Sequence, residues 1–269
     1  MQCLVDSREV HVHCLPAAPG ADKAAIVLLH GACQDHRAWM PVAGALARAG
    51  HAVYAPDLPG HSASAGPPCA GVPELAAWLL ELLDALGIDR CALAGHSMGS
   101  LMGLHLAAMA PQRVSHLALV GTAVPMPVSP VLLERARSDP DAAMQDMALW
   151  SHKGSRAQPP DPALVEASLQ LMRSVQARWP AGDLLATDLG ACNAYSHGLE
   201  MARRLRMPVQ LVLGEADRMT PVRATEELRQ ALPQAGLSLL DSGHALMQER
   251  PRELAQALLE LLGRSGAPS

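Results

Sequence analysis

The sequence contains no phenylalanine and few other aromatic residues. Among 269 residues there are four tryptophans and two tyrosines, so aromatic side chains make up 2% of the chain, whereas methionine occurs 13 times. Apolar cavities in this protein must therefore be lined by aliphatic and thioether side chains. Such walls adapt to different ligands and specify ligand shape poorly.

Cysteine pairing patterns and extended basic patches are also missing. The six cysteines form no CxxC pair and show no regular spacing, which argues against a zinc knuckle or a disulfide framework and predicts reduced thiols. The formal net charge is −5, and the only basic cluster, Arg203, Arg204 and Arg206, is typical of a helix C-terminus. These features argue against a nucleic acid or an anionic membrane as a partner.

The sequence likewise lacks targeting and cofactor signals. Residues 1–9 have neither the basic nor the apolar region of a signal peptide, so we predict a cytoplasmic protein. Residues 91–112 carry no formal charge, but a buried strand followed by a buried helix explains them better than a transmembrane segment, which we do not expect. No Gly-rich phosphate loop or metal-ligand array is present, so we expect no cofactor and no metal.

The apolar segments predict an α/β protein with a mostly parallel central sheet covered by helices on both faces. With 49% hydrophobic and 17% charged residues, the chain can bury one large core. Uniformly apolar runs that alternate with amphipathic helical segments are typical of such a sheet. Only Glu9–His13 alternates in polarity, which predicts an edge strand. The predicted buried strands are 24–29, 52–55, 91–94, 114–120, 209–213 and 237–240, and predicted helices include 39–48, 72–86 and 251–262.

Between Thr122 and Arg206 this alternation stops. Prolines are frequent there, and helical fragments at 142–150 and 162–178 follow one another without intervening strands. An insertion of this length between two core strands predicts a helical lid over the C-terminal edge of the sheet, where ligands bind in open α/β folds. We therefore predict an α/β core of residues 1–123 and 206–269 and an inserted lid of residues 124–205.

Residues 95–99 read Gly95-His96-Ser97-Met98-Gly99, between an apolar strand and an apolar helix. Flanking glycines allow a strained turn that lifts the Ser97 hydroxyl clear of the sheet, with a helix N-terminus beneath it. A serine held in this way is typically a nucleophile, although the pentapeptide alone also fits a glycine-rich turn with an idle serine. The backbone N–H of Met98, at the start of the helix, is a candidate donor to an oxyanion.

A nucleophilic serine needs a base, and the base needs an anion to orient it. Of the twelve histidines, only His244 lies just past the last predicted core strand, in a glycine-containing loop before the final helix. Three candidate acids lie near the last predicted strands, between the serine and this loop in the expected order: Asp217, Glu215 two residues earlier, and Asp241 directly before the loop. Asp57 more plausibly orders its own Pro-Gly turn.

Four segments together resemble the α/β-hydrolase fold family over nearly the whole chain. They are Leu29-His30-Gly31-Ala32, Asp57-Leu58-Pro59-Gly60-His61-Ser62, the elbow at 95–99, and Gly214-Glu215-Ala216-Asp217 with Ser242-Gly243-His244. Within the family, the motifs around Gly31 and Ser97 are similar to those of monoacylglycerol lipases and small esterases. The resemblance implies that Asp217 is the acid of a triad with Ser97 and His244, and that Ala32 gives the second oxyanion N–H. A serine at the elbow disfavours the aspartate-nucleophile branches, epoxide hydrolases and haloalkane dehalogenases.

We therefore predict a carboxylesterase-like serine hydrolase that cleaves an ester of a small, mostly apolar molecule through an acyl-enzyme. The same triad also fits a lactone, a thioester or a carbon–carbon bond, and the fold also suits a cofactor-free perhydrolase or a ligand-binding protein without turnover. The physiological substrate and the oligomeric state stay open. For the segment 188–195 we favour a structural role. Candidates for pocket lining or lid core are Met126, Met144, Met147, Trp150, Met172 and Trp179.

Overall fold

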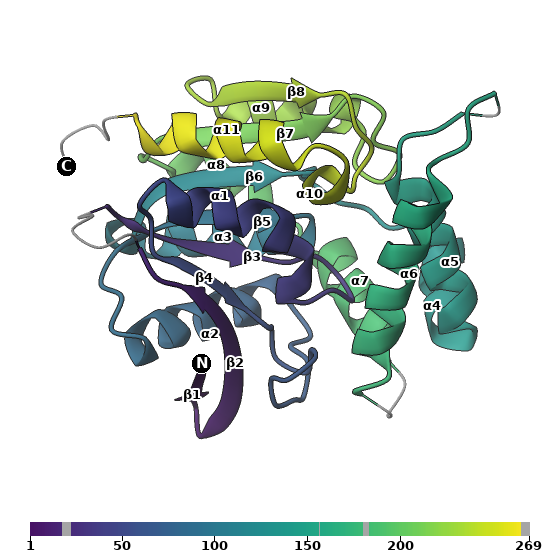
Figure 1. The fold of residues 1–269 in the computed structure, drawn as a ribbon, viewed down its shortest axis with the longest axis horizontal. Helices are drawn as coiled ribbons and strands as arrows, with labels where there is room; N and C mark the ends of the chain where they lie inside the picture. The colour runs from purple at the N-terminus through teal and green to yellow at the C-terminus, as the bar shows by residue number, and fades with distance from the viewer. Residues whose placement is uncertain (18–22, 156, 180–182, 265–269) are drawn as a thin grey trace.

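A computed structural model of the protein describes residues 1–17, 23–155, 157–179 and 183–264 (Figure 1). The remaining residues, 18–22, 156, 180–182 and 265–269, fall within the predicted core and lid ranges but lie outside the described residues. The central element is an eight-stranded sheet with the order β1-β2-β4-β3-β5-β6-β7-β8. Its strands are β1 (Gln2–Val5), β2 (Arg8–Leu15), β3 (Ala25–Leu29), β4 (Val53–Pro56), β5 (Cys91–His96), β6 (Val114–Val120), β7 (Val209–Gly214) and β8 (Gly236–Leu240).

The predicted mostly parallel sheet is confirmed. Strands β3 to β8 pair in parallel, and β1 and β2 are antiparallel additions at one side. The predicted edge position of Glu9–His13 is wrong, because β2 has β4 on one side and β1 on the other. The chain reverses at Asp6 and Ser7, which adopt φ values of 48° and 62°, so the first residues pair back along β2 and become the edge.

Helices cover both faces of the sheet, as the uniformly apolar strands predict. On β3, Ile26 and Leu28 belong to one buried cluster and Val27 and Leu29 to the other, because successive side chains of a strand point to opposite faces. The first cluster includes α1 (Met40–Arg48) and α11 (Pro251–Leu262). The second includes α2 (Val72–Ala85), α3 (Met98–Met109) and part of α8 (Gly198–Arg204). Shorter helices are η1 (His36–Trp39), η2 (Pro111–Arg113), η3 (Val222–Thr225), α9 (Glu226–Ala231) and α10 (Leu246–Glu249).

The segment between β6 and β7 forms the helices α4 (Pro130–Ser138), α5 (Pro140–Ser151), α6 (Pro162–Gln176), α7 (Leu184–Ala194) and α8. The prolines that interrupt the pattern here begin α4, α5 and α6, and each follows a capping side chain, Ser129, Asp139 or Asp161, that accepts a backbone N–H of the first turn. The sequence predicted α5 and α6 but not α4 or α7. Figure 1 shows α4 to α7 grouped at one side, beyond the ends toward which β3, β6 and β8 point. The boundaries of the lid stay a prediction, and α8, inside the predicted lid range, packs against α3.

Within the described ranges, no helix is both long enough and apolar enough to cross a membrane.

Candidate functional site

Ser97 lies in the sharp turn between the central strand β5 and helix α3. Its φ of 51° and ψ of −118° place it in the left-handed half of backbone space, where a non-glycine residue is strained. The Ser97 N–H donates to the Val120 carbonyl of the neighbouring strand β6, at 2.9 Å. The strained turn expected from the sequence is therefore present, and the hydroxyl of Ser97 lines a cavity.

The two flanking glycines are required by close backbone packing. A Cβ at Gly95 would overlap the carbonyl oxygen of Gly99, and a Cβ at Gly99 would lie 2.6 Å from the carbonyl oxygen of His30. The start of α3 therefore packs directly onto the end of β5 and onto the loop after β3. This packing fixes where the Ser97 hydroxyl and the first N–H groups of α3 point.

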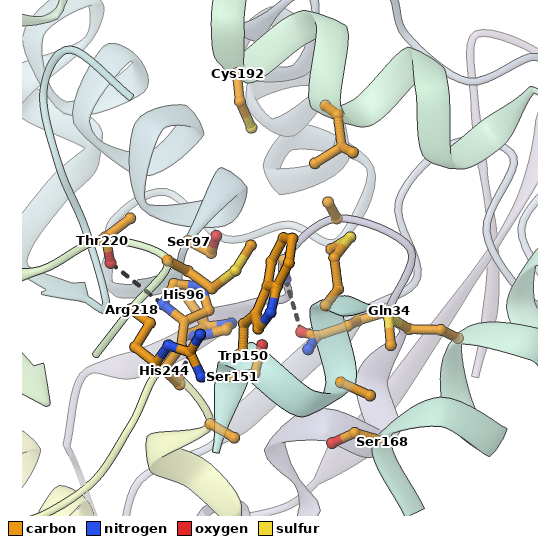
Figure 2. Close-up of a pocket in the computed structure, with 18 of the residues that line it drawn as sticks. Gln34, His96, Ser97, Trp150, Ser151, Ser168, Cys192, Arg218, Thr220 and His244 are labelled. Atoms are coloured by element: carbon orange, nitrogen blue, oxygen red, sulfur yellow. Dashed lines mark hydrogen bonds between the residues drawn. The ribbon is translucent and has the colours of Figure 1, made fainter. Parts of the chain in front are cut away.

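His244 and Asp217 meet beside this turn. His244 lies between β8 and α10, and Asp217 follows β7; their Nδ1 and Oδ2 atoms are 2.7 Å apart. The Thr220 hydroxyl donates to the same Asp217 oxygen at 2.9 Å and lies 3.2 Å from His244 Nδ1. These ring contacts use Nδ1 and leave Nε2 of His244 free of them. Figure 2 shows His244, Thr220 and Ser97 around the cavity.

Asp217 is held as a buried anion. Burial alone would raise the pKa of Asp217, but His244 and the donors from Thr220 outweigh this and lower the pKa to about 2. Its second oxygen accepts the N–H groups of Met219 and Thr220, both at 2.8 Å. The two other candidate acids lie elsewhere, because Glu215 is exposed and Asp241 pairs at the surface with Lys153 and Arg250.

His96, the residue before Ser97, supports the backbone of His244. Its Nε2–H donates to the His244 carbonyl at 2.9 Å, and the two rings are 4.7 Å apart. Burial, followed by the neighbouring His244, lowers the pKa of His96 to about 3, so its ring is neutral. Its buried Nδ1 has no hydrogen-bond partner among the described residues and faces Gly31, where a Cβ would approach it to 3.0 Å.

The loop after β3 carries Ala32, the second predicted oxyanion donor. The loop is held from both sides: Gly31 N–H donates to the Gln34 side chain at 3.1 Å, and Cys33 N–H donates to Asp188 at 2.7 Å. Cys33 has a φ of 52°, a strained value that such bonds help to maintain. Ala32 lies in the loop after β3, Met98 is the first residue of α3 after the neighbouring strand β5, and Ala32 lines the cavity. Their role as oxyanion donors stays a prediction.

A buried ion pair, which the sequence did not predict, joins Asp188 of α7 to His61 in the loop after β4. Asp188 lies 2.9 Å from His61 Nε2, while His61 Nδ1 lies 3.0 Å from the Pro59 carbonyl. Both oxygens accept, so both nitrogens of His61 must carry protons. Burial alone would lower the pKa of His61, but Asp188 raises it above 6.5. The favoured structural role of the segment 188–195 agrees with this contact, although Cys192 of the same helix also lines the cavity.

These histidines predict how stability depends on pH. His61 keeps its proton longer in the folded protein, so its contribution is complete below pH 6.5 and is lost as the pH rises through its folded pKa. His30 and His96 act in the opposite sense, because burial lowers their pKa values to about 4 and about 3, and stability falls as the pH decreases from 6.5 toward these values. We expect the free energy of unfolding, measured with urea from pH 4.5 to 9, to be greatest near pH 6.5.

The Asp188→Asn variant isolates the His61 contribution. It should reduce the decline above pH 6.5 and leave the acid side in place, since His30 and His96 are unchanged. A smaller decline should remain, because the hydrogen bond to Asp57 also raises the pKa of His36. The exposed His197→Gln variant should alter neither side. A slope above pH 6.5 that is as steep in Asp188→Asn as in the wild type would contradict a protonated His61.

The cavity next to Ser97 has a volume of about 280 Å³ and is enclosed by the core and by the insertion. Of the six lid residues considered from the sequence, Met126, Met147, Trp150 and Met172 line it, whereas Met144 is buried away from it and Trp179 packs on Gly66. The places that aromatic rings often fill are taken by the single Trp150 and by five thioethers, those of Met126, Met147, Met172, Met219 and Met247. Figure 2 shows Arg218 beside His244 at this cavity.

The chain is similar to known proteins over most of its length. A family model described as the alpha/beta hydrolase fold matches residues 24–251. RutD of Pseudomonas savastanoi pv. phaseolicola, a protein named for the hydrolysis of a carbamate, is 29% identical over 251 residues, which cover 90% of this chain and 95% of RutD. The pimeloyl-[acyl-carrier protein] methyl ester esterase of Aromatoleum aromaticum is 32% identical over 249 residues, covering 86% of this chain and 94% of the esterase.

A solved structure gives the same picture of the fold. The enol-lactonase from Burkholderia xenovorans LB400 matches with a TM-score of 0.82 and 24% identity, over 98% of this chain and 100% of the lactonase. At this identity the likeness concerns the fold alone. The three proteins are named for hydrolysis of different bonds. The bond that this chain cleaves must therefore be inferred from the residues of its own site.

Proposed function

Because this chain belongs to the alpha/beta hydrolase fold family and is similar to hydrolases over most of its length, we propose that it is a serine hydrolase that cleaves a carboxylic ester. The observation that carries this proposal is the arrangement around one cavity of a strained Ser97 and the hydrogen-bonded pair His244 and Asp217. A lone idle serine would not require a buried, oriented histidine beside it.

In the proposed mechanism His244 Nε2 takes the proton of Ser97 as the hydroxyl attacks the ester carbonyl. Asp217 accepts the Nδ1–H of His244, which fixes the tautomer and stabilises the imidazolium that forms. The carbonyl oxygen gains negative charge and accepts the N–H groups of Ala32 and Met98. His244 then protonates the leaving alcohol, and a water molecule activated by the same nitrogen releases the acid from Ser97.

The insertion supports a small, mostly apolar substrate. Residues of α4 to α7 line the cavity opposite Ser97, and we propose that residues 124–205 act as its lid. An ester is favoured over a lactone, thioester or carbon–carbon bond because a relative named as a methyl ester esterase is 32% identical. The proposed steps use only side chains of the chain and water.

Two measurements on the wild-type protein test the proposal. A fluorophosphonate should label the protein once, with mass spectrometry placing the label on Ser97. Esters of p-nitrophenol with acyl chains of graded length should be hydrolysed with a burst of product, fastest for short chains that fit about 280 Å³. Absence of both labelling and turnover, with a ligand-induced thermal shift, would contradict the proposal and favour a binding protein. Faster turnover of lactones, thioesters, ring-cleavage products or peroxide would reassign the bond.

Arg218 predicts a preference among esters. It is the only lysine, arginine, aspartate or glutamate among the cavity-lining residues of the described chain. A mostly apolar substrate with a carboxylate at its far end could therefore place that group against the exposed guanidinium. We expect Arg218→Met to lower kcat/KM about fivefold for a dicarboxylic half-ester, which corresponds to about 1 kcal/mol, and to leave a neutral ester of equal length nearly unchanged.

Arg218→Lys provides the matched control, because it keeps the charge. It should retain most of the preference for the half-ester. An equal loss for both esters in Arg218→Met would indicate that Arg218 only supports the fold of the Asp217 loop.

A further inference from the structure

A second cluster of functional side chains lies outside the cavity. His11 is on β2, His36 begins η1, and Asp57 directly follows β4. Each offers one nitrogen or oxygen atom that can bind a metal, and these three atoms lie within 4.8 Å of one another. None of the three residues lines the cavity beside Ser97.

Backbone pairing and hydrogen bonds set the positions of these three residues. Strands β2 and β4 pair with Val12 opposite Pro56, and the Asp57 N–H donates to the His11 carbonyl at 2.9 Å. The buried Asp57 carboxylate then accepts both the backbone N–H of His36, at 2.9 Å, and its ring Nδ1–H, at 2.7 Å. From the sequence we predicted that Asp57 orders its own turn, and its contact with the Ala63 N–H at 3.4 Å agrees with this. That prediction does not explain the contacts of Asp57 with His11 and His36.

A third imidazole adjoins the cluster. His13 follows His11 on the same face of β2, and its ring stacks on that of His36 with centroids 5.4 Å apart and planes within 3°. The His11 and His36 rings have centroids 4.9 Å apart. All three histidines are partly exposed, so an ion could reach them from solvent.

We propose that His11, His36 and Asp57 bind a divalent transition-metal ion of the zinc class, with His13 beside the site and water as the remaining ligand. Imidazole nitrogens with one carboxylate are a donor set that suits zinc, whereas magnesium and calcium prefer oxygen ligands alone. In a tetrahedral site with bonds of about 2.1 Å, ligand atoms lie roughly 3.4 Å apart. His36 Nδ1 and Asp57 Oδ1, now 2.7 Å apart, would therefore separate slightly, and atoms as far apart as 4.8 Å would approach by about 1.4 Å. The ion takes the place of the proton shared by His36 and Asp57.

Such an ion joins three segments, β2, η1 and the turn after β4. Because η1 follows the loop that carries Ala32, the ion would stabilise this side of the molecule without contacting the cavity. The metal site does not depend on the proposed hydrolase activity, and its test therefore needs no substrate.

Isothermal titration of the purified protein with zinc chloride tests the proposal. We expect one ion per chain and a rise in Tm with zinc concentration. Substitution of cobalt(II) should give the visible absorption of a tetrahedral ion. His11→Gln and His36→Gln should each weaken zinc binding at least about tenfold, with His13→Gln weakening it less.

Matched controls separate this site from other zinc ligands in the chain. The exposed His197→Gln variant should bind zinc as the wild type does. Cys3→Ser and Cys14→Ser should also bind normally, because Cys14 lies on the opposite face of β2 from His11 and His13. Because Asp57 is buried and a variant there could unfold, the histidine variants decide the question, with circular dichroism as the check of folding.

Three results would overturn the proposal: no stoichiometric binding to the folded wild type, binding unchanged in both His11→Gln and His36→Gln, or binding lost in a cysteine variant. Each would show that the cluster is a hydrogen-bonded surface feature and not a metal site.

Discussion

Replacing Ser97 with alanine should lower kcat for ester hydrolysis by about 10⁶-fold and abolish labelling by a fluorophosphonate. Alanine removes the only oxygen that the proposed mechanism joins to the acyl group, so neither the acyl-enzyme nor the phosphonate adduct can form. The proposed oxyanion donors, the N–H groups of Ala32 and Met98, stay in place, and they would account for any activity that remains above the rate in water. Stopped assays over hours and gel fluorescence measure the two effects.

The substitution is well suited to the elbow. Alanine keeps the Cβ of Ser97, which packs so close to Gly31 that a Cβ built on Gly31 would lie 3.2 Å from it. At φ 51° alanine and serine have the same backbone strain. The fold should therefore persist, which circular dichroism can check. Ser151→Ala is the matched control, because Ser151 lines the same cavity but lies at the end of α5, away from the elbow.

Ser151→Ala should keep the label and the burst of product. If Ser97→Ala were labelled as fast as the wild type while Ser151→Ala was not, the nucleophile would be a different hydroxyl of the cavity. Full ester hydrolysis by Ser97→Ala would contradict covalent catalysis at the elbow altogether.

The elbow could be predicted from the sequence because its causes are local. Gly95 and Gly99 are needed within five residues of one another, where α3 packs on β5, and a residue pattern records such contacts directly. The parallel strands were predictable for a similar reason. A strand such as β3 buries side chains on both faces, which leaves a continuous apolar run in the sequence.

The contacts of α7 with the core could not be predicted, because they join residues that are far apart in the chain. Asp188 meets His61 across 127 positions and Cys33 across 155, and no spacing rule links these residues. The one available signal was a carboxylate inside the otherwise apolar and small-residue helix α7. A buried charge of this kind requires a partner, but the sequence does not say which of twelve histidines provides it.

The edge of the sheet was mispredicted for a related physical reason. Alternating polarity in β2 reflects one face against the core and one face with the partly exposed His11 and His13. A strand with this pattern can pair with another strand on either side. The short strand β1, which pairs with its free side, has too few buried apolar residues to be recognised in the sequence. The same pairing of β2 with β4 brings His11 to Asp57, so the metal-binding cluster was hidden together with the strand order.

Replacing Asp217 with asparagine should lower kcat by about 10⁴-fold and change KM little. Asp217 accepts the Nδ1–H of His244 at 2.7 Å, whereas the asparagine amide can instead donate to Nδ1. His244 would then carry its proton on Nε2, where it cannot accept the proton of Ser97. Initial rates with a short p-nitrophenyl ester, normalised to active sites titrated by prolonged fluorophosphonate labelling, measure the loss.

Two substitutions at the alternative acids provide the controls. Asp241→Asn and Glu215→Gln should each change kcat less than about threefold, because Asp241 pairs only with surface cations and Glu215 is exposed. A larger loss in either control than in Asp217→Asn would move the acid of the triad to that residue. Since Asp217 alone among the three accepts a hydrogen bond from His244 in the structure, the effect of its charge should be confined to the orientation and protonation of that ring, and thus to kcat.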